Sequence, residues 1–281
     1  MNKVISNKIL KMVLLMTVLL WFNAGYAQLS TKDFLARYDL SYTVINPDTA
    51  PTDGVYSWWI AASKEEWRSY DNEPLVDEWL KRPEPLGFRG KNYQRFYIHF
   101  DTICKVSPTV YKLEARSRCK DEYCNIIGSI VIDSVIPEAD TSYRSSINVT
   151  ESGFIYAHYD MDAYIENKRI AHLFGRSSYW YLVHNDSVYY NALLIVADGY
   201  DNNQYTGKWV NLASNDTLTC NWGDYRIPES WEFDSGAYLF HPNRDYYDYG
   251  WKSYIDYVES TGQDFLYFKE LLIKDNDWWK K

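Results

Sequence analysis

The stretch Tyr111-Lys-Leu-Glu-Ala-Arg-Ser-Arg118 indicates the fold class. Apolar or small residues occupy its odd-numbered positions, and charged residues occupy its even-numbered positions. A period of two places the two sets on opposite faces of a β-strand, whereas a helix would not separate them. The stretch therefore predicts a strand with Tyr111, Leu113 and Ala115 on one face.

The same pattern continues on both sides of this stretch. Upstream, Phe96, Ile98 and Phe100 alternate with polar or charged residues. Four further runs have the character of strands: 130–132, 153–159, 170–174 and 179–184. The polar pairs at 185–186 and 215–216 are typical of hairpin turns. Many short strands with frequent turn signals predict a mainly β protein, either an antiparallel β-sandwich or a β-barrel.

Residues 28–92 differ from the rest of the chain because they carry helix signals. Ser63-Lys-Glu-Glu66 matches a capping box, and the run from Pro74 to Lys81 is typical of a short helix. We therefore expect a mixed N-terminal region with short helices over residues 28–92, packed on a β-rich domain of residues 93–281. Two domains divided near residue 90 are the alternative.

Residues 1–27 have the order of a secretory signal peptide. Lysines come first, an apolar run follows at 12–22, and the small residues Gly25 and Ala27 precede Gln28. The apolar run is shorter than the about 20 residues that a membrane span needs, so we expect no transmembrane segment in the mature chain. The sequence predicts export, to the periplasm, the outer envelope or the medium, with a membrane-anchoring N-terminus as the alternative.

Composition restricts the classes of function. The 281 residues include 29 basic and 38 acidic ones, for a net charge of −9, and 18% are aromatic. Aromatic side chains on this scale can form a core, which argues against a disordered chain. An acidic surface repels a phosphate backbone, so no nucleic-acid partner is expected.

Four cysteines in an exported chain suggest disulfides. Cys119 and Cys124 lie between two strand-like runs, and a four-residue hairpin loop would place them opposite each other. We therefore expect a Cys119–Cys124 disulfide, with Cys104 and Cys220 either paired or free. A zinc site is the alternative, although no pair of histidines accompanies the cysteines. No metal or other cofactor is expected.

The most distinctive part of the chain runs from Asn203 to Tyr254. Its motifs are Gly207-Lys-Trp209, Cys220-Asn-Trp-Gly-Asp-Tyr-Arg-Ile-Pro228, Asp234-Ser-Gly236 and Gly250-Trp-Lys-Ser-Tyr254. Together with residues 112–132, this pattern resembles a group of exported bacterial proteins of unassigned function, which implies export and no particular activity. The first motif is also similar to the G-x-W of lipocalin-like barrels, which lies in the first strand there, whereas here it is near the C-terminus. That similarity implies a barrel with one end closed by the Trp.

Local catalytic fingerprints are absent from the sequence: it has no G-x-S-x-G elbow, H-E-x-x-H helix, Walker A loop or G-x-G-x-x-G. His158, Asp160 and Asp162 recur with a period of two and would share one face of a strand, as a metal or acid–base cluster requires. Alternatively, the strand ends at Asp160 and the two acids belong to a turn. Glu229, Glu232 and Asp234 offer carboxylates for a glycosidase, as many acidic exported chains do.

Paired and clustered aromatic residues form the remaining signal. They are Trp58-Trp59, Tyr179-Trp-Tyr181, Tyr189-Tyr190, Tyr246-Tyr-Asp-Tyr249 and Trp278-Trp279. Outward Trp and Tyr rings suit sugar stacking or a protein contact, and cross-strand packing is the alternative. The candidate binding residues are Tyr246, Tyr247, Tyr249, Trp251, Trp180 and Trp231. We therefore expect an exported non-catalytic protein that binds a glycan or another protein. An extracytoplasmic hydrolase acting on glycans or peptides and a structural envelope-associated protein are the alternatives.

Overall fold

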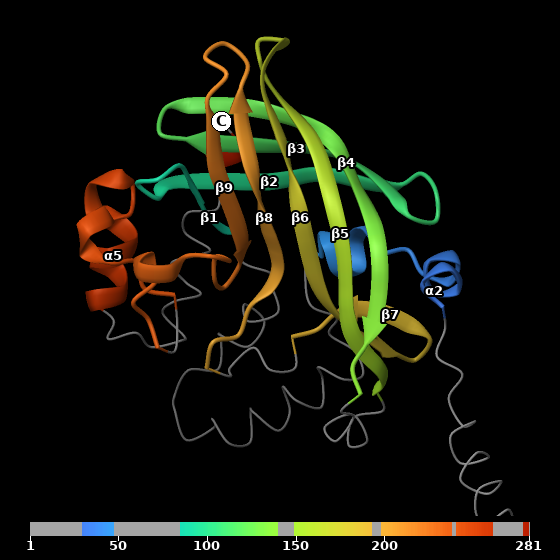
Figure 1. The fold of residues 1–281 in the computed structure, drawn as a ribbon. Helices are drawn as coiled ribbons and strands as arrows, with labels where there is room; N and C mark the ends of the chain where they lie inside the picture. Colours follow the sequence, from blue (N-terminus) through green and yellow to red (C-terminus); the bar gives the residue numbers. More distant parts are fainter. Residues whose placement is uncertain are drawn as a thin grey trace, which may run out of the picture.

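The computed structural model describes residues 30–47, 85–139, 149–192, 198–237, 240–260 and 278–280. These residues form one nine-stranded antiparallel sheet with short helical elements around it (Figure 1). The prediction of a mainly β, antiparallel fold is confirmed. The expected signal peptide and the expected helices at 63–66 and 74–81 lie outside the described residues.

The strands are β1 (Leu86–Arg89), β2 (Gln94–Lys105), β3 (Val110–Cys119), β4 (Glu122–Pro137), β5 (Val149–Ile165), β6 (Lys168–His184), β7 (Ser187–Tyr190), β8 (Asn202–Asn211) and β9 (Thr217–Asp224). The α-helices are α2 (Thr31–Arg37) and α5 (Lys252–Ser260), and η1 (Ser41–Ile45) is a π-helical turn. Three short 3-10 helices complete the set: η3 (Trp231–Phe233), η4 (Arg244–Tyr249) and η5 (Trp278–Lys280).

Strand pairing closes on itself. The circuit runs β1–β2–β3–β4–β5–β6–β8–β9 and returns to β1, while β7 pairs with the end of β6 beyond β8. In Figure 1, β2 and β3 pass behind β9, β8, β6 and β5 at a steep angle. Because β1 has only four residues and register shifts interrupt several ladders, the sheet is barrel-like without being a regular barrel.

The period of two that predicts the strands also accounts for the core. Tyr111, Leu113 and Ala115 of β3 are buried, and the charged residues between them face outward. The space enclosed by the sheet is filled largely by aromatic rings, with Trp222 stacked on Tyr205 at a centroid distance of 4.8 Å. Such rings each remove a large apolar surface from water and provide much of the driving force for folding.

Residues 30–47 cover part of this core. Ser30 caps α2 by accepting a hydrogen bond from the backbone N–H of Asp33, and Phe34 lies in the main core. The side chain of Asn203 in β8 donates to the backbone carbonyls of Val44 and Ile45 in η1, which ties this segment to the sheet. The segment thereby shields aromatic side chains that the strands alone would leave open.

Trp209, from the Gly207-Lys-Trp209 motif, is buried in the main core. The guanidinium of Arg89 in β1 lies 4.4 Å from its ring centroid and forms a 2.7 Å ion pair with Glu122. A Cβ at Gly207 would overlap the hydroxyl of Tyr159, so a glycine is required for the tyrosine ring to cross this point. The motif therefore serves packing, and β1, which lies inside the expected N-terminal region, is a full member of the sheet.

A second apolar core is formed by β1, the ends of β5, β6 and β7, and the segment after β9. Leu86 and Phe88 contribute from β1, and Phe233 and Trp251 pack with them. Trp251 has no exposed surface, and its indole N–H donates to the carbonyl of Tyr93 at 2.7 Å. The expectation that Trp251 belongs to a binding surface is therefore wrong, because its ring is part of this second core.

The expected Cys119–Cys124 disulfide is absent, and all four cysteines are free. The hairpin between β3 and β4 has a two-residue turn, so Cys119 pairs with Glu122 and Cys124 pairs with Ser117. The two cysteines are therefore diagonal neighbours, whose Cα atoms lie about 7–8 Å apart in such a ladder. A disulfide needs about 4.4–6.8 Å.

The free thiols lead to a testable expectation. Cys104 is exposed, whereas burial raises the pKa of Cys124 to about 12 and also raises the pKa of Cys119 and Cys220. Because the thiolate is the reactive form, a thiol reagent at neutral pH should label one cysteine in the native protein and four after denaturation without reductant. Mass spectrometry of the labelled chain measures both numbers. Two labels after denaturation would contradict the free-thiol arrangement.

Candidate functional site

The structure places His158, Asp160 and Asp162 on one outward face of β5, as the period of two predicts. The strand continues to Ile165, so the interpretation that it ends at Asp160 is wrong. The three side chains do not form one cluster, however. The His158 ring lies 2.8 Å from a carboxylate oxygen of Asp133 in β4.

A histidine on the next strand joins the two aspartates instead. The Nδ1 of His172 in β6 lies 3.0 Å from Asp162, its Nε2 lies 3.6 Å from Asp160, and Arg169 pairs with Asp162 at 2.5 Å. The register that pairs Asp162 with His172 brings them together, and sequence spacing alone does not reveal it. Among the described residues, no group of His, Cys, Asp and Glu has the geometry of a metal site.

The outer face of β3, β4 and β5 carries rows of outward side chains set by the strand register. One row contains Lys112, Ser129 and Asp160; the next contains Glu114, Ile127 and Asp162; the third contains Arg116, Asn125 and Tyr164. A hollow of about 460 Å³ lies along the first two rows, and we call it the polar hollow. A second hollow of about 280 Å³ lies at the third row, next to the Trp pair of η5.

We call this second hollow the aromatic groove. Its rings are Tyr123 of β4, Tyr164 of β5, and Trp278 and Trp279 of η5. Its polar side chains include Arg116, which is half-buried, and Asn125 and Glu166, which are exposed. These residues come from four separate segments of the chain. The groove therefore exists only once the sheet has formed and the C-terminal residues have docked on it.

Contacts on β2 and β3 fix the two tryptophans. The ring of Trp279 stacks on His99 of β2 at a centroid distance of 4.0 Å with 8° between the planes, and its carbonyl accepts a hydrogen bond from Arg116. Trp278 is nearly buried and packs on Tyr97, whose ring also carries the guanidinium of Arg118 at 4.0 Å. Trp279 is half-buried and lines the groove. Figure 1 shows the C-terminus beside β2, on the far side of the molecule.

The other predicted aromatic residues lie elsewhere. Tyr246, Tyr247 and Tyr249 of η4 are half-buried, because each packs against the second core. Trp180 of β6 stacks parallel to Phe154 of β5 at 5.8 Å. The ring of Trp180 is therefore engaged in cross-strand packing, which is the alternative reading of such pairs.

Trp231 differs from the other candidates, because 74% of its surface is exposed. Its φ is +41°, and Glu229 and Tyr225 have φ values of +55° and +65°. A left-handed backbone at a bulky residue is rare and costs about 1–3 kcal/mol. We call residues 225–234 the Trp231 loop.

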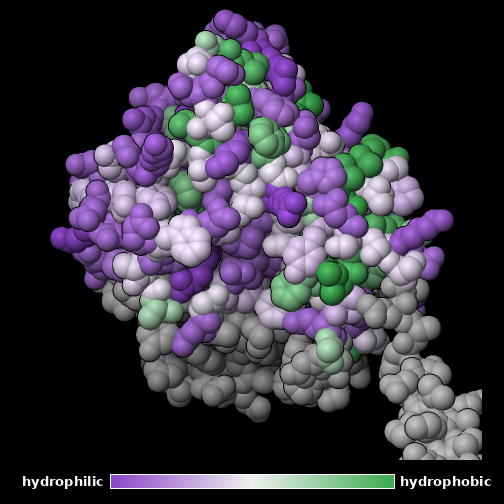
Figure 2. Space-filling view, viewed as in Figure 1, coloured by the Kyte–Doolittle hydropathy of each residue, from purple (hydrophilic) through white to green (hydrophobic). Residues whose placement is uncertain are grey.

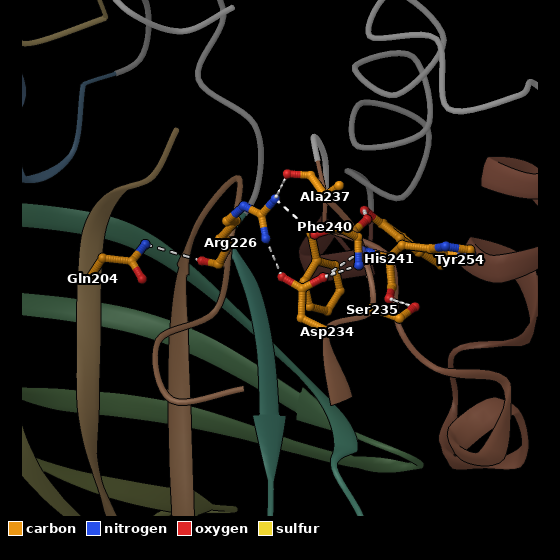
Figure 3. A network of polar contacts seen from close by, with 9 residues as sticks. Gln204, Arg226, Asp234, Ser235, Ala237, Phe240, His241 and Tyr254 are labelled. Carbon is orange, nitrogen blue, oxygen red and sulfur yellow. Dashed lines mark hydrogen bonds and ion pairs between the residues drawn. The ribbon is translucent and has the colours of Figure 1, made fainter. Parts of the chain in front are cut away.

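A polar network holds the Trp231 loop. Arg226 and Asp234 form a 2.6 Å ion pair, and their side chains are 18% and 7% exposed. The other oxygen of Asp234 accepts hydrogen bonds from the backbone N–H groups of Gly236 and His241. Figure 3 shows Arg226 and Asp234 directed at each other, with the backbone of the neighbouring segments around them.

The carboxylates proposed for a glycosidase all have structural contacts. Asp234 is in the network just described, Glu232 accepts a hydrogen bond from the hydroxyl of Tyr93, and Glu229 accepts one from Asn221. Burial and the hydrogen bond to Glu232 raise the pKa of Tyr93 to about 12, so its hydroxyl stays a donor at neutral pH. These contacts explain the three carboxylates without a catalytic role.

The polar character of the surface varies across the molecule. Figure 2 shows hydrophilic residues over the α5 side and hydrophobic patches toward β4 and β5. The described residues contain no helix that is long and apolar enough to cross a membrane. Comparisons with protein-family models, with curated proteins and with solved structures found no match.

Proposed function

We propose that the protein is an exported, non-catalytic binding protein that recognises a saccharide at the aromatic groove. One observation carries the proposal: four aromatic rings share a hollow of about 280 Å³ with a guanidinium, an amide and a carboxylate. The volume is near the lower end of the about 300–1,000 Å³ that is usual for small-molecule sites. It therefore suits one or two sugar rings.

The groove has groups that can contact both the apolar face and the hydroxyl groups of a sugar. A sugar ring has an apolar C–H face and a rim of hydroxyl groups. Trp and Tyr rings offer flat apolar surfaces, and Arg116, Asn125 and Glu166 supply donors and acceptors for hydroxyl groups. Trp279 meets the requirement that such a ring be held rigidly, because its stack on His99 fixes its plane.

The polar hollow extends this surface along β3, β4 and β5. Its outward side chains include Lys112, Glu114, Ser129 and Asp160, all of which can bond to hydroxyl groups. Adjacent rows are two residues apart along each strand, or about 7 Å. An oligosaccharide that stacks on Trp279 could thus reach the polar hollow with its next residues.

The contacts on this face give less support to a hydrolase activity. Asp162 is paired with both Arg169 and His172, and Asp160 lies near the same imidazole. The arrangement favours an ion-pair network on the strand face over acid–base catalysis.

Replacing Trp279 by alanine should strongly weaken saccharide binding. The change takes away the ring that stacks on His99 while the backbone carbonyl that Arg116 contacts remains. A central aromatic contact of this kind contributes about 2 kcal/mol or more to binding, so we expect the dissociation constant to rise by about thirtyfold. The measurement is a glycan array with the exported form of the chain, followed by titration calorimetry with the best glycan.

Trp231→Ala is the matched control, because it removes an exposed indole from a different part of the surface. It should bind the glycan as the unchanged protein does. Asn125→Ala provides a second test inside the groove and should weaken binding without removing a ring. Equal glycan binding by the Trp279→Ala and Trp231→Ala proteins, or no glycan bound by the unchanged protein, would contradict the proposed function.

A further inference from the structure

The Trp231 loop combines a strained backbone with an exposed indole. Three of its residues have a left-handed backbone without being glycine, and Trp231 is the bulkiest of them. Two nearby residues in the same loop, Ile227 and Phe233, are buried in the second core. The loop nevertheless directs Trp231 into solvent.

Specific polar contacts hold the Trp231 loop in this conformation. The ion pair between Arg226 and Asp234 closes the loop at its base, and Arg226 also donates to the carbonyls of Gly236 and Ala237. Asn221 donates to the carbonyl of Pro228 at 3.1 Å from the adjacent strand. The surrounding contacts therefore impose the strained geometry, which is the pattern found where strain serves a function.

Packing within the described residues gives no reason for the position of Trp231. No ring pair among them includes its indole, whereas Phe233, two residues later, packs on Tyr93, Tyr246 and Trp251. An exposed indole on a rigid loop is the typical anchor of a protein–protein contact. Because 74% of the surface of Trp231 is exposed, its ring is available for contact with a partner protein.

The charges beside Trp231 indicate the chemistry of the partner. Glu229 and Glu232 are both exposed, and their described contacts are with neutral groups, the Asn221 amide and the Tyr93 hydroxyl. A carboxylate on either side of an indole attracts a cation, and the ring face adds a cation–π contact. The chain as a whole is also acidic, with a net charge of −9.

We propose that the Trp231 loop is a docking site for a partner protein, and that it takes a lysine- or arginine-bearing segment of that partner. The cationic side chain lies over the Trp231 indole between Glu229 and Glu232. This site is separate from the aromatic groove, which lies on β3–β5 and η5, and it does not depend on saccharide binding.

The test uses an array of short peptides graded in lysine and arginine content, with glutamine at the same positions in the matched set. The unchanged protein should retain the cationic peptides at least tenfold more strongly than the glutamine set. Trp231→Gly should abolish this preference, Glu232→Gln should reduce it several-fold, and added salt should weaken it. Trp279→Ala should leave it unchanged.

A thermal melt of the Trp231→Gly protein provides the second measurement. Glycine adopts a left-handed backbone without strain, so the melting temperature should stay the same or rise by a few degrees. A structural role for the indole predicts a clear fall instead. Such a fall, a cationic preference that survives Trp231→Gly, or no cationic preference in the unchanged protein would each overturn the proposal. Glycan binding is scored separately, so its loss or retention tests the proposed function alone.

Discussion

Replacing Asp234 by alanine should lower the free energy of unfolding by about 3–5 kcal/mol, the usual cost of removing one partner from a buried ion pair. The reason is that the change leaves the guanidinium of Arg226 largely shielded from water without its carboxylate. It also removes the acceptor for the backbone N–H groups of Gly236 and His241. Urea denaturation followed by circular dichroism measures the loss.

The matched control is Lys252→Ala. Lys252 and Asp256 form an ion pair four residues apart on α5, and their side chains are 66% and 46% exposed. Solvent screens such a pair, so its loss should cost far less than the loss of the Arg226–Asp234 pair. Similar losses for the Asp234 and Lys252 variants would show that the Arg226–Asp234 pair does not hold the loop.

Replacing Trp222 by alanine should cost about 3–5 kcal/mol, which is usual when a large buried aromatic ring is lost. Its ring has no exposed surface and contacts Tyr205, Tyr159 and Phe96 at centroid distances of 4.8, 5.2 and 5.9 Å. The cavity would open in the middle of the main core, where the closed sheet cannot collapse onto it. Denaturant unfolding again gives the value.

Trp222→Phe keeps most of the ring volume and is the control for this experiment. It should cost clearly less than the alanine variant. It also removes the indole N–H, which has no hydrogen-bond partner among the residues that the structure describes, so loss of the polar atom itself is not a penalty. If the alanine variant were as stable as the phenylalanine variant, the ring of Trp222 would not be important for the stability of the main core.

Local periodicity predicted strands such as β3, in which apolar and polar residues alternate, but it did not predict β1. Residues such as Tyr111 and Leu113 are buried because successive side chains of a strand point to opposite faces. This alternation can be read directly from the order of apolar and polar residues in the chain. The face of β5 that carries His158, Asp160 and Asp162 was predicted for the same reason.

Pairing between strands could not be predicted in this way. The Cys119–Cys124 disulfide fails because a turn of two residues rather than four shifts the register of one hairpin. His172 meets Asp162 only through the β5–β6 register. The aromatic groove needs the β3–β4 and β4–β5 registers and the docking of η5, so the Trp278-Trp279 pair was visible in the sequence while its neighbours were not.

The burial of Trp251 could not be predicted from the sequence, because it depends on the second core. Side chains alternate between an inward and an outward face only where the backbone is a strand. Trp251 instead precedes α5, in a segment that folds back on β1. Trp231, which was predicted as a binding residue, is exposed, and its left-handed backbone appears only in the structure.

The meeting of β1 and β9 has a consequence for how the chain acquires its native state. Neighbouring hairpins from β2 to β6 can form one after another as soon as their residues emerge, because each pairs with the next in sequence. The ladder from Leu86 to Gly223 joins segments at opposite ends of the sheet, and its loop-closure entropy is the largest. Ring completion is therefore expected as the late, slow step of folding, and nascent chains that stop before residue 217 should remain open.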